Sequence, residues 1–141
     1  MKLDSIRFLS AGKFSTDSNI WVHPKVNSAF DELIYVTKGT LRICEDYSEY
    51  SVTENSAIWL QSSHLHYGTN ATGKPLSFIR VIFSSSPDNN VKSDACIHFR
   101  KLSRPKNQAK FVALCHFLAE SSNDPDYPSY FNDYIVRLLL T

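Results

Sequence analysis

The sequence is poor in cysteine and glycine, and neither sign of charge dominates it. Its 141 residues include 3 Cys and 4 Gly, and 15 Lys and Arg stand against 14 Asp and Glu, giving a formal net charge of +1. This odd, widely spaced set of thiols argues against a disulfide framework or a thiolate zinc site and indicates free thiols at Cys44, Cys96 and Cys115. A nearly neutral chain is also not expected to bind nucleic acid or an anionic membrane through bulk electrostatics.

Long apolar runs are missing as well. The longest, SFIRVIF and YIVRLLL, are far too short for a membrane span, and each carries an arginine. The N-terminal segment has no continuous apolar stretch of the kind found in a signal peptide. We therefore predict a cytoplasmic protein without a membrane partner. Hydrophobic residues still make up 43% of the chain, which is enough to build the core of one compact domain.

Two patterns follow one another along the chain. Up to about residue 100, short runs rich in Ile, Val, Phe, Tyr and Trp alternate with turn-forming segments, which is typical of an all-β barrel or sandwich. The clearest hairpin is ELIYVTKGTLRICED, in which Gly39 supplies the positive φ of the turn. The sequence therefore predicts a β-barrel domain over 1–100 and a helical segment over 101–141.

The helical segment shows two amphipathic patterns joined by a short loop that contains proline. In the first, Phe111, Leu114, Cys115 and Leu118 recur at helical spacing, with Ser103 and Pro105 suited to the first turn. The second has its apolar stripe at Phe131, Tyr134, Ile135, Leu138 and Leu139. Because the connection is short, we expect the two helices to pack as an antiparallel pair.

The spacing of polar residues around the hairpin resembles the two cupin motifs. Glu32 followed after six residues by Gly39 matches the end of the first motif, and His66 and Asn70 match the end of the second. Within the second motif, Asn55, Gln61 and Ser63 stand where cupins have Gly, Pro and Gly. The order of DELIYVTKGTLRI, TENSAIWLQSSHLH and two helices is most similar to the N-terminal domain of AraC-type transcription regulators, and the resemblance runs from about Asp31 to the end of the chain.

This resemblance implies a cupin-like barrel followed by a helix pair, acting as the effector-sensing and dimerisation half of a regulator. It implies a small polar, sugar-like metabolite in the barrel and a homodimer. It also implies that DNA is bound only through a helix-turn-helix domain that this chain lacks. On this hypothesis the chain is not an enzyme and uses no cofactor. The alternatives are a stand-alone cupin enzyme, such as a metal-dependent dioxygenase or isomerase, and a metal-free cupin with a structural role.

The cupin metal ligands are incomplete in this sequence. The first two imidazoles belong near Val26 to Ser28, where there is no histidine, and His23 lies nine residues before Glu32. Only Glu32 and His66 remain of the four ligands, whereas a catalytic metal needs at least three from protein. We therefore predict no metal site, with His64 as a neighbour that faces solvent.

Strand alternation indicates which side chains line the barrel. If Glu32 faces inward, Ile34, Val36 and Lys38 share its side, although Lys38 also suits a solvent-exposed turn. Arg80, in an apolar strand, either pairs with a carboxylate such as Glu32 or binds a ligand. The predicted ligand-binding residues are Trp21, His23, Glu32, Ile34, Val36, Lys38, His66, Tyr67 and Arg80, although the aromatic members also suit a simple core role.

The second helix is apolar over a wide part of its circumference. One barrel surface is not expected to cover it, so we predict that the same helix of a second copy does. A downstream domain is the alternative cover. The predicted dimer interface consists of Phe131, Tyr134, Ile135, Leu138 and Leu139.

Overall fold

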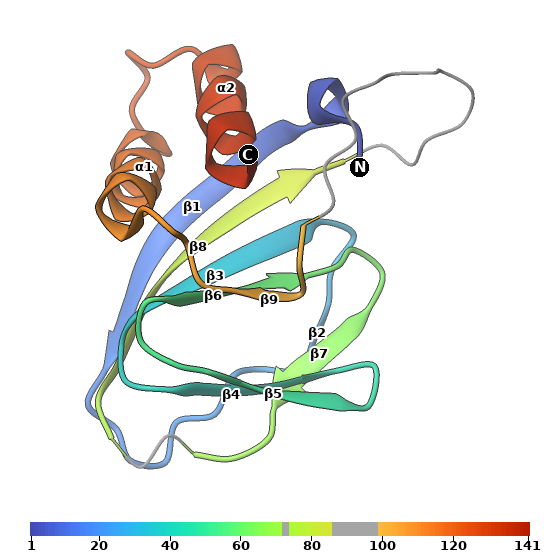
Figure 1. The fold of residues 1–141 in the computed structure, drawn as a ribbon, viewed down its shortest axis with the longest axis vertical. Helices are drawn as coiled ribbons and strands as arrows, with labels where there is room; N and C mark the ends of the chain where they lie inside the picture. Colours follow the sequence, from blue (N-terminus) through green and yellow to red (C-terminus); the bar gives the residue numbers. More distant parts are fainter. Residues whose placement is uncertain (72–73, 86–98) are drawn as a thin grey trace.

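The structure is a computed structural model that describes residues 1–71, 74–85 and 99–141. Two antiparallel sheets face each other, and two helices lie beyond the larger sheet (Figure 1). The strands are β1 (Arg7–Thr16), β2 (Val26–Asn27), β3 (Asp31–Lys38), β4 (Leu41–Glu45), β5 (Ser48–Val52), β6 (Ser56–Leu60), β7 (Leu65–Gly68), β8 (Leu76–Ser84) and β9 (Leu102–Ser103). A short 3-10 helix, η1 (Leu3–Ser5), precedes β1, and the α-helices are α1 (Gln108–Ser121) and α2 (Ser129–Leu140).

The strand order is that of a jelly roll. One sheet has the order β1-β8-β3-β6-β9 and the other β2-β7-β4-β5, so over the first eight strands the chain changes sheet at every connection except the β4–β5 hairpin, as in two interlocked Greek keys. Over the described residues, the two sheets do not close into a continuous barrel. This confirms the predicted mainly β, cupin-like architecture with a C-terminal helix pair, in an open form. The segment after residue 100 also contributes to the first sheet, because β9 pairs with β6.

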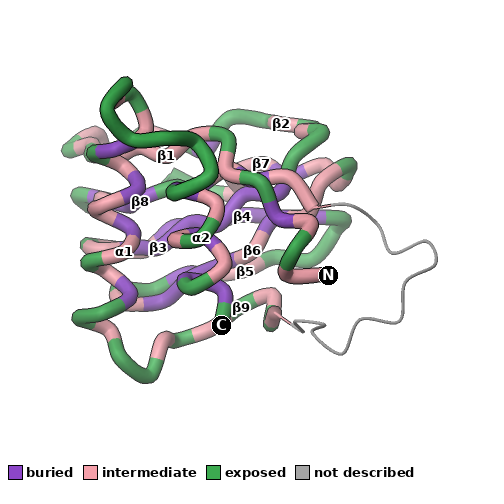
Figure 2. The backbone as a smooth tube through the Cα atoms, turned by 90° about the horizontal axis from the view of Figure 1, so that it is seen from above, coloured by how far each residue is buried: buried purple, intermediate pink, exposed green. Residues whose placement is uncertain are grey.

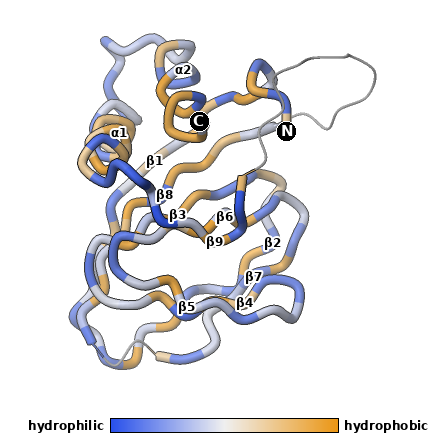
Figure 3. The backbone as a smooth tube through the Cα atoms, in the orientation of Figure 1, coloured by the Kyte–Doolittle hydropathy of each residue, from blue (hydrophilic) through white to orange (hydrophobic). Residues whose placement is uncertain are grey.

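Strand β3 separates two hydrophobic cores, and all its residues from Asp31 to Val36 are buried. Ile34 and Val36 pack between the sheets with side chains from β4, β5, β6 and β8. Leu33 and Tyr35, on the other face, pack under the helices. Figure 2 shows the buried residues concentrated in the central strands β3, β4 and β8, and Figure 3 shows hydrophobic stretches along β8 and α2.

The predicted hairpin between β3 and β4 does not form: β3 pairs with β6 and β8 in one sheet and β4 pairs with β5 and β7 in the other, so the turn at Gly39 connects the two sheets. Gly39 has a φ of +80°, and a Cβ built on it would lie 2.3 Å from the carbonyl oxygen of Pro75. Both observations require glycine at this turn. Two thiols, Cys44 and Cys115, are buried and free as predicted, and Cys96 lies outside the described residues. Among the described residues, no helix has the length and hydropathy needed to cross a membrane.

Helix α1 begins later than Ser103 and Pro105 suggested. Ser103 belongs to β9, and the helix is capped by Asn107, whose side chain accepts a hydrogen bond from the Lys110 backbone N–H. The predicted apolar stripe is confirmed, because Phe111, Cys115 and Leu118 are buried and Leu114 packs partly against the same core.

Helix α2 packs one side on the core and leaves Phe131, Tyr134 and Leu138 of the predicted interface exposed. Its buried residues are Asn132, Val136, Leu139 and Leu140. Asn132 accepts a hydrogen bond from the Ser121 hydroxyl of α1 at 2.9 Å, which satisfies a polar group inside the helix pair. Leu139 is 5% exposed and belongs to this chain's own core, so it is not available to a second copy.

Candidate ligand-binding site

Three titratable side chains meet inside the jelly roll. Glu32 comes from β3, His66 from β7 and His23 from the loop before β2, and they are 6%, 1% and 8% exposed. The His66 Nε2 lies 3.6 Å from the Glu32 Oε2, and the two imidazole rings are 5.4 Å apart between centroids. The His23 Nδ1 is 2.7 Å from the Pro24 carbonyl oxygen, which fixes that ring.

Some polar atoms of this group have no hydrogen-bond partner among the described residues. Among the described residues, the Glu32 Oε1 and both ring nitrogens of His66 are buried and have no partner in hydrogen-bonding geometry. Each such group costs about 1–3 kcal/mol of folding stability, and nearly all buried polar atoms in proteins have a partner. Glu32 and His66 are therefore placed where a bound polar molecule can supply the missing hydrogen bonds.

Burial also sets the protonation of the group. It raises the pKa of Glu32, and the positive charge of Arg80 opposes that rise only in part. Burial lowers the pKa of His66 and lowers the pKa of His23 to about 4. At neutral pH both imidazoles are therefore uncharged, so each has one nitrogen that can donate a hydrogen bond and one that can accept one.

A pocket of about 280 Å³ opens beside His23. Three aromatic rings form one wall: Phe14 lies 4.7 Å from Trp21 and 4.9 Å from Phe78, centroid to centroid. Trp21 also meets His23 edge-on at 6.0 Å. The full lining is Gly12, Lys13, Phe14, Trp21, His23, Pro24, Phe78 and Arg80. His23 thus belongs both to the pocket and to the buried group with His66.

Arg80 contributes the positive charge of this pocket. In the sheet it lies between Gly12 of β1 and Ile34 of β3, and its side chain is exposed. It shares the inward face of β8 with Phe78, which packs in the core between the sheets. Lys13 is directed elsewhere, because its Nζ lies 3.7 Å from Glu120 of α1. No ion pair between Arg80 and a described carboxylate falls within 4.0 Å, so the proposed direct pairing with Glu32 is not formed.

Gly12 leaves the space over Arg80 open. A Cβ built on Gly12 would have no other atom within 4 Å, and its φ is not positive. The backbone conformation therefore does not require glycine here, unlike at Gly39. A residue with a side chain at this position would instead occupy the pocket.

Most of the predicted ligand-binding residues come together, and two do not. Glu32, Ile34, Val36 and His66 face the interior between the sheets, while Trp21, His23 and Arg80 line the pocket. Lys38 is exposed at the end of β3, where the register with β8 shifts after Val36. Tyr67 lies on the outer face of β7 beside Cys44, opposite to its neighbour His66.

The residues do not assemble a metal centre of the cupin type. Among the described residues, Glu45, Asp46 and His64 form the single group of three potential ligands whose donor atoms lie within 4.8 Å of one another. These atoms are already engaged: Glu45 binds the Gln61 backbone N–H and Lys101, and His64 is bonded to Asp46. In the interior, the donor atoms of Glu32, His66 and His23 do not all lie within 4.8 Å of one another, so these three described residues are not arranged as the three protein ligands that a catalytic metal needs.

Sequence reasoning missed Gly12, Phe14 and Phe78 as pocket residues. Phe14 and Phe78 read as ordinary core residues because each lies in an apolar strand. Gly12 becomes informative only through its pairing with Arg80, which links residues 68 positions apart and leaves no local signal. The ion pair of the buried Glu45 with the partly exposed Lys101, which lies 5.9 Å above the Trp59 ring, was missed for the same reason.

Comparison with known proteins supports no assignment beyond the fold. No protein-family model and no curated protein matches the sequence. Among solved structures, a predicted oxalate decarboxylase from Thermotoga maritima has 13% identity and a TM-score of 0.49, over 55% of this chain and 68% of that one. A cupin superfamily protein from Desulfitobacterium hafniense has 12% identity and a TM-score of 0.48, over 58% and 70%.

A third structure, a conserved protein of unknown function from Streptococcus pyogenes, has 18% identity and a TM-score of 0.48. The match covers 55% of this chain and 65% of that chain, so this chain spans just under two thirds of that protein. At such identities and TM-scores, nothing about ligand or activity transfers to this chain.

Proposed function

We propose that this chain is a cupin-type sensing module that binds a small polar metabolite between its sheets and dimerises through its helices. In the AraC-type arrangement that the sequence resembles, such a module controls a separate DNA-binding domain. The observation that carries the proposal is the buried group of Glu32 and His66, which has three unpaired polar atoms and adjoins His23, whose ring lines a pocket of about 280 Å³ and lies 5.4 Å from that of His66. A purely structural core gains nothing from unpaired polar atoms, whereas a polar ligand satisfies them.

The position of the helices supports sensing. Strand β1, which supplies Gly12 and Phe14 to the pocket, is also bonded to both helices. The Ala11 backbone N–H donates to the Ser122 hydroxyl at 3.1 Å, and the Phe8 backbone N–H donates to Asp133 at 2.7 Å. A ligand that moves β1 would therefore also act on the helical layer, which is what a regulator that changes its dimer on ligand binding requires.

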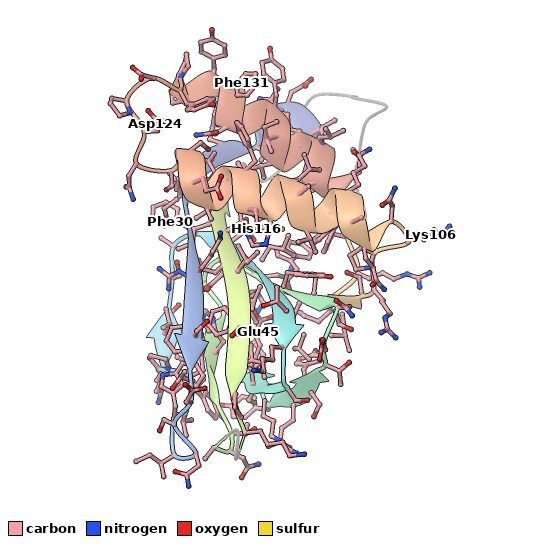
Figure 4. The ribbon with its side chains drawn as sticks, turned by 90° about the vertical axis from the view of Figure 1, so that its left-hand side faces the viewer. Phe30, Glu45, Lys106, His116, Asp124 and Phe131 are labelled. Carbon is pink, nitrogen blue, oxygen red and sulfur yellow. The ribbon has the colours of Figure 1, made fainter. Side chains whose placement is uncertain are left out.

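The exposed face of α2 supports dimerisation. Tyr134 is 60% exposed, Leu138 is 46% exposed and Phe131 is 41% exposed, and Figure 4 shows Phe131 on the outer part of the helical layer. These three residues lie at helical spacing on one face, and Tyr130, at 63% exposure, extends it. A symmetric pairing of α2 with its copy buries this face, and the proposed interface is therefore Tyr130, Phe131, Tyr134 and Leu138.

A thermal-shift screen of wild type and Glu32→Gln against sugars, sugar acids and other small organic acids tests the sensing function. A ligand that binds only the native state must raise the melting temperature, and its effect should fall in the variant that alters the unpaired group. The proposal would be contradicted if no compound of the library raised the melting temperature of either wild type or Glu32→Gln. Conversion of a compound during these incubations would favour the cupin enzyme instead.

A further inference from the structure

We infer that the ligand of this pocket is a small carboxylic acid that is held by Arg80 at its carboxylate and by His23, which the buried His66 and Glu32 adjoin, at a hydroxyl or amino group. This inference rests on the proposed sensing function and specifies the chemical class of the ligand.

The carboxylate end follows from Arg80. Its side chain is the cation on the inward face of the pocket lining, since Lys13 is directed to Glu120. Among the described residues, no carboxylate lies within ion-pair distance of Arg80. A guanidinium presents two parallel N–H donors that match a carboxylate, and such a pair is stronger than a neutral hydrogen bond. The open space over Gly12 lets a ligand reach it.

The other end of the ligand follows from the buried group. His23 lines the pocket, its ring lies 5.4 Å from that of His66, and the His66 Nε2 is 3.6 Å from Glu32. Because the His23 Nδ1 is bonded to the Pro24 carbonyl oxygen, the Nε2 of the neutral ring is an acceptor, so the complementary ligand group carries a hydrogen-bond donor. A hydroxyl and an ammonium both meet this requirement.

The size and wall of the pocket limit the body of the ligand. A volume of about 280 Å³ is at the small end of the range for small-molecule sites, which corresponds to a single ring or a short chain. The wall of Phe14, Trp21 and Phe78 offers a surface on which the face of a planar or sugar ring can stack.

The test uses pairs of probes that differ only in the acid group. Glucuronate is compared with glucose and phenyllactate with phenyllactamide, and phenylalanine is added to distinguish an amino from a hydroxyl donor. Each probe is titrated by calorimetry and thermal shift, up to 10 mM, into wild type and Arg80→Gln. Arg42→Gln is the matched control, because Arg42 is also an exposed strand arginine but lies on the outer face of β4.

We expect at least one acid to bind wild type and Arg42→Gln at least tenfold more tightly than its neutral counterpart. We expect Arg80→Gln to lose that tenfold preference, while any affinity for the neutral probe stays the same. Equal affinity for acid and neutral probe, acid affinity unchanged in Arg80→Gln, or no binding of any acid would overturn the inference. A neutral probe that binds wild type but not Glu32→Gln would leave the sensing function standing and reject only the ligand class.

A steric variant separates the pocket from the charge. Gly12→Val adds a side chain into the open space without a positive φ to oppose it, and a β-branched residue suits a strand interior. We expect the melting temperature without ligand to stay the same or rise, and the binding of every probe to fall at least tenfold. Acid binding that survives Gly12→Val in the folded protein would show that the ligand lies elsewhere.

Discussion

His23 gives the most direct test of the buried group, because its protonation links the interior to stability. In the unfolded chain its pKa is near 6.5, and burial lowers it to about 4 in the folded protein. Between these values the unfolded state binds the proton and the folded state does not, so stability rises with pH. The contribution is fully present above pH 6.5 and is lost as the pH falls towards 4.

The size of this pH-dependent change in the free energy of unfolding follows from the two pKa values. A difference of about 2.5, at about 1.4 kcal/mol for each pKa unit, corresponds to about 3.5 kcal/mol in all, of which about 3 kcal/mol is lost by pH 4, where the folded ring is half protonated. His23 is only 8% exposed, so solvent screening reduces this figure little. We therefore expect wild type to lose about 3 kcal/mol of unfolding free energy between pH 7 and pH 4 through His23 alone. His23→Gln, which stays neutral, should lack this component.

Urea unfolding at half-unit steps from pH 7.5 to 4 measures the difference between the two proteins. Trp21 lies 6.0 Å from His23, and so its fluorescence also reports on the local structure. An NMR titration of the His23 ring protons supplies the folded pKa directly. A His23 that titrates near 6.5 in the folded protein, or parallel pH profiles for wild type and His23→Gln, would refute the buried placement of this ring.

Three further predictions concern the buried carboxyl, the helix and the metal. Burial raises the pKa of Glu32, so ionisation of this carboxyl lowers the stability of the folded protein as the pH rises through the folded pKa. Glu32→Gln cannot ionise and should therefore unfold at a higher urea concentration than wild type at pH 8. The difference should be smaller at pH 4, where the wild-type carboxyl is largely protonated. Leu138→Asp should convert the dimer into a folded monomer in sedimentation experiments. Val136→Asp is the control at a fully buried position and should prevent folding. A wild-type protein that is monomeric at tens of micromolar would contradict the predicted dimer. The purified protein should contain well below one equivalent of transition metal, and EDTA should leave its melting temperature unchanged; about one equivalent that survives dialysis would contradict this.

The parts of the fold that the sequence predicted are those encoded locally. The turn at Gly39 depends on a φ that glycine alone adopts easily, although it connects the two sheets and not the paired strands of a hairpin. Glu32, Ile34 and Val36 follow the two-residue period of a strand. The same period limits the site prediction: His66 and Tyr67 are adjacent in β7, so they point to opposite faces and do not both line the interior.

The errors of the sequence prediction come from contacts between distant segments. Lys38 leaves the alternation because the register of β3 with β8 shifts after Val36. In α2 the apolar residues extend around the helix, and the core-facing side is decided by packing on β1 and by the polar contact of Asn132 with Ser121. An asparagine in that position looks like a surface residue in the sequence, so the sequence did not identify the side of Asn132 and Val136 as the one that faces the core, and it placed Leu139 in the interface although Leu139 packs in the core.

Strand β1 makes the link between pocket and helices testable. Gly12 faces the pocket, and the preceding residue, Ala11, donates its backbone N–H to the Ser122 hydroxyl at the end of α1. If a ligand shifts β1, this hydrogen bond transmits the shift to α1. By thermodynamic linkage, a ligand that strengthens dimerisation by a given factor must also bind the dimer more tightly than the monomer by that factor. We therefore expect the dimer dissociation constant to change about fivefold or more on adding a saturating acid probe, which is the usual lower range of such coupling.

Ser122→Ala removes the bond without touching the pocket lining or the exposed face of α2, and it should reduce this change while leaving ligand affinity of the monomer the same. A dimer constant that the probe changes equally in wild type and Ser122→Ala would show that the coupling takes another route.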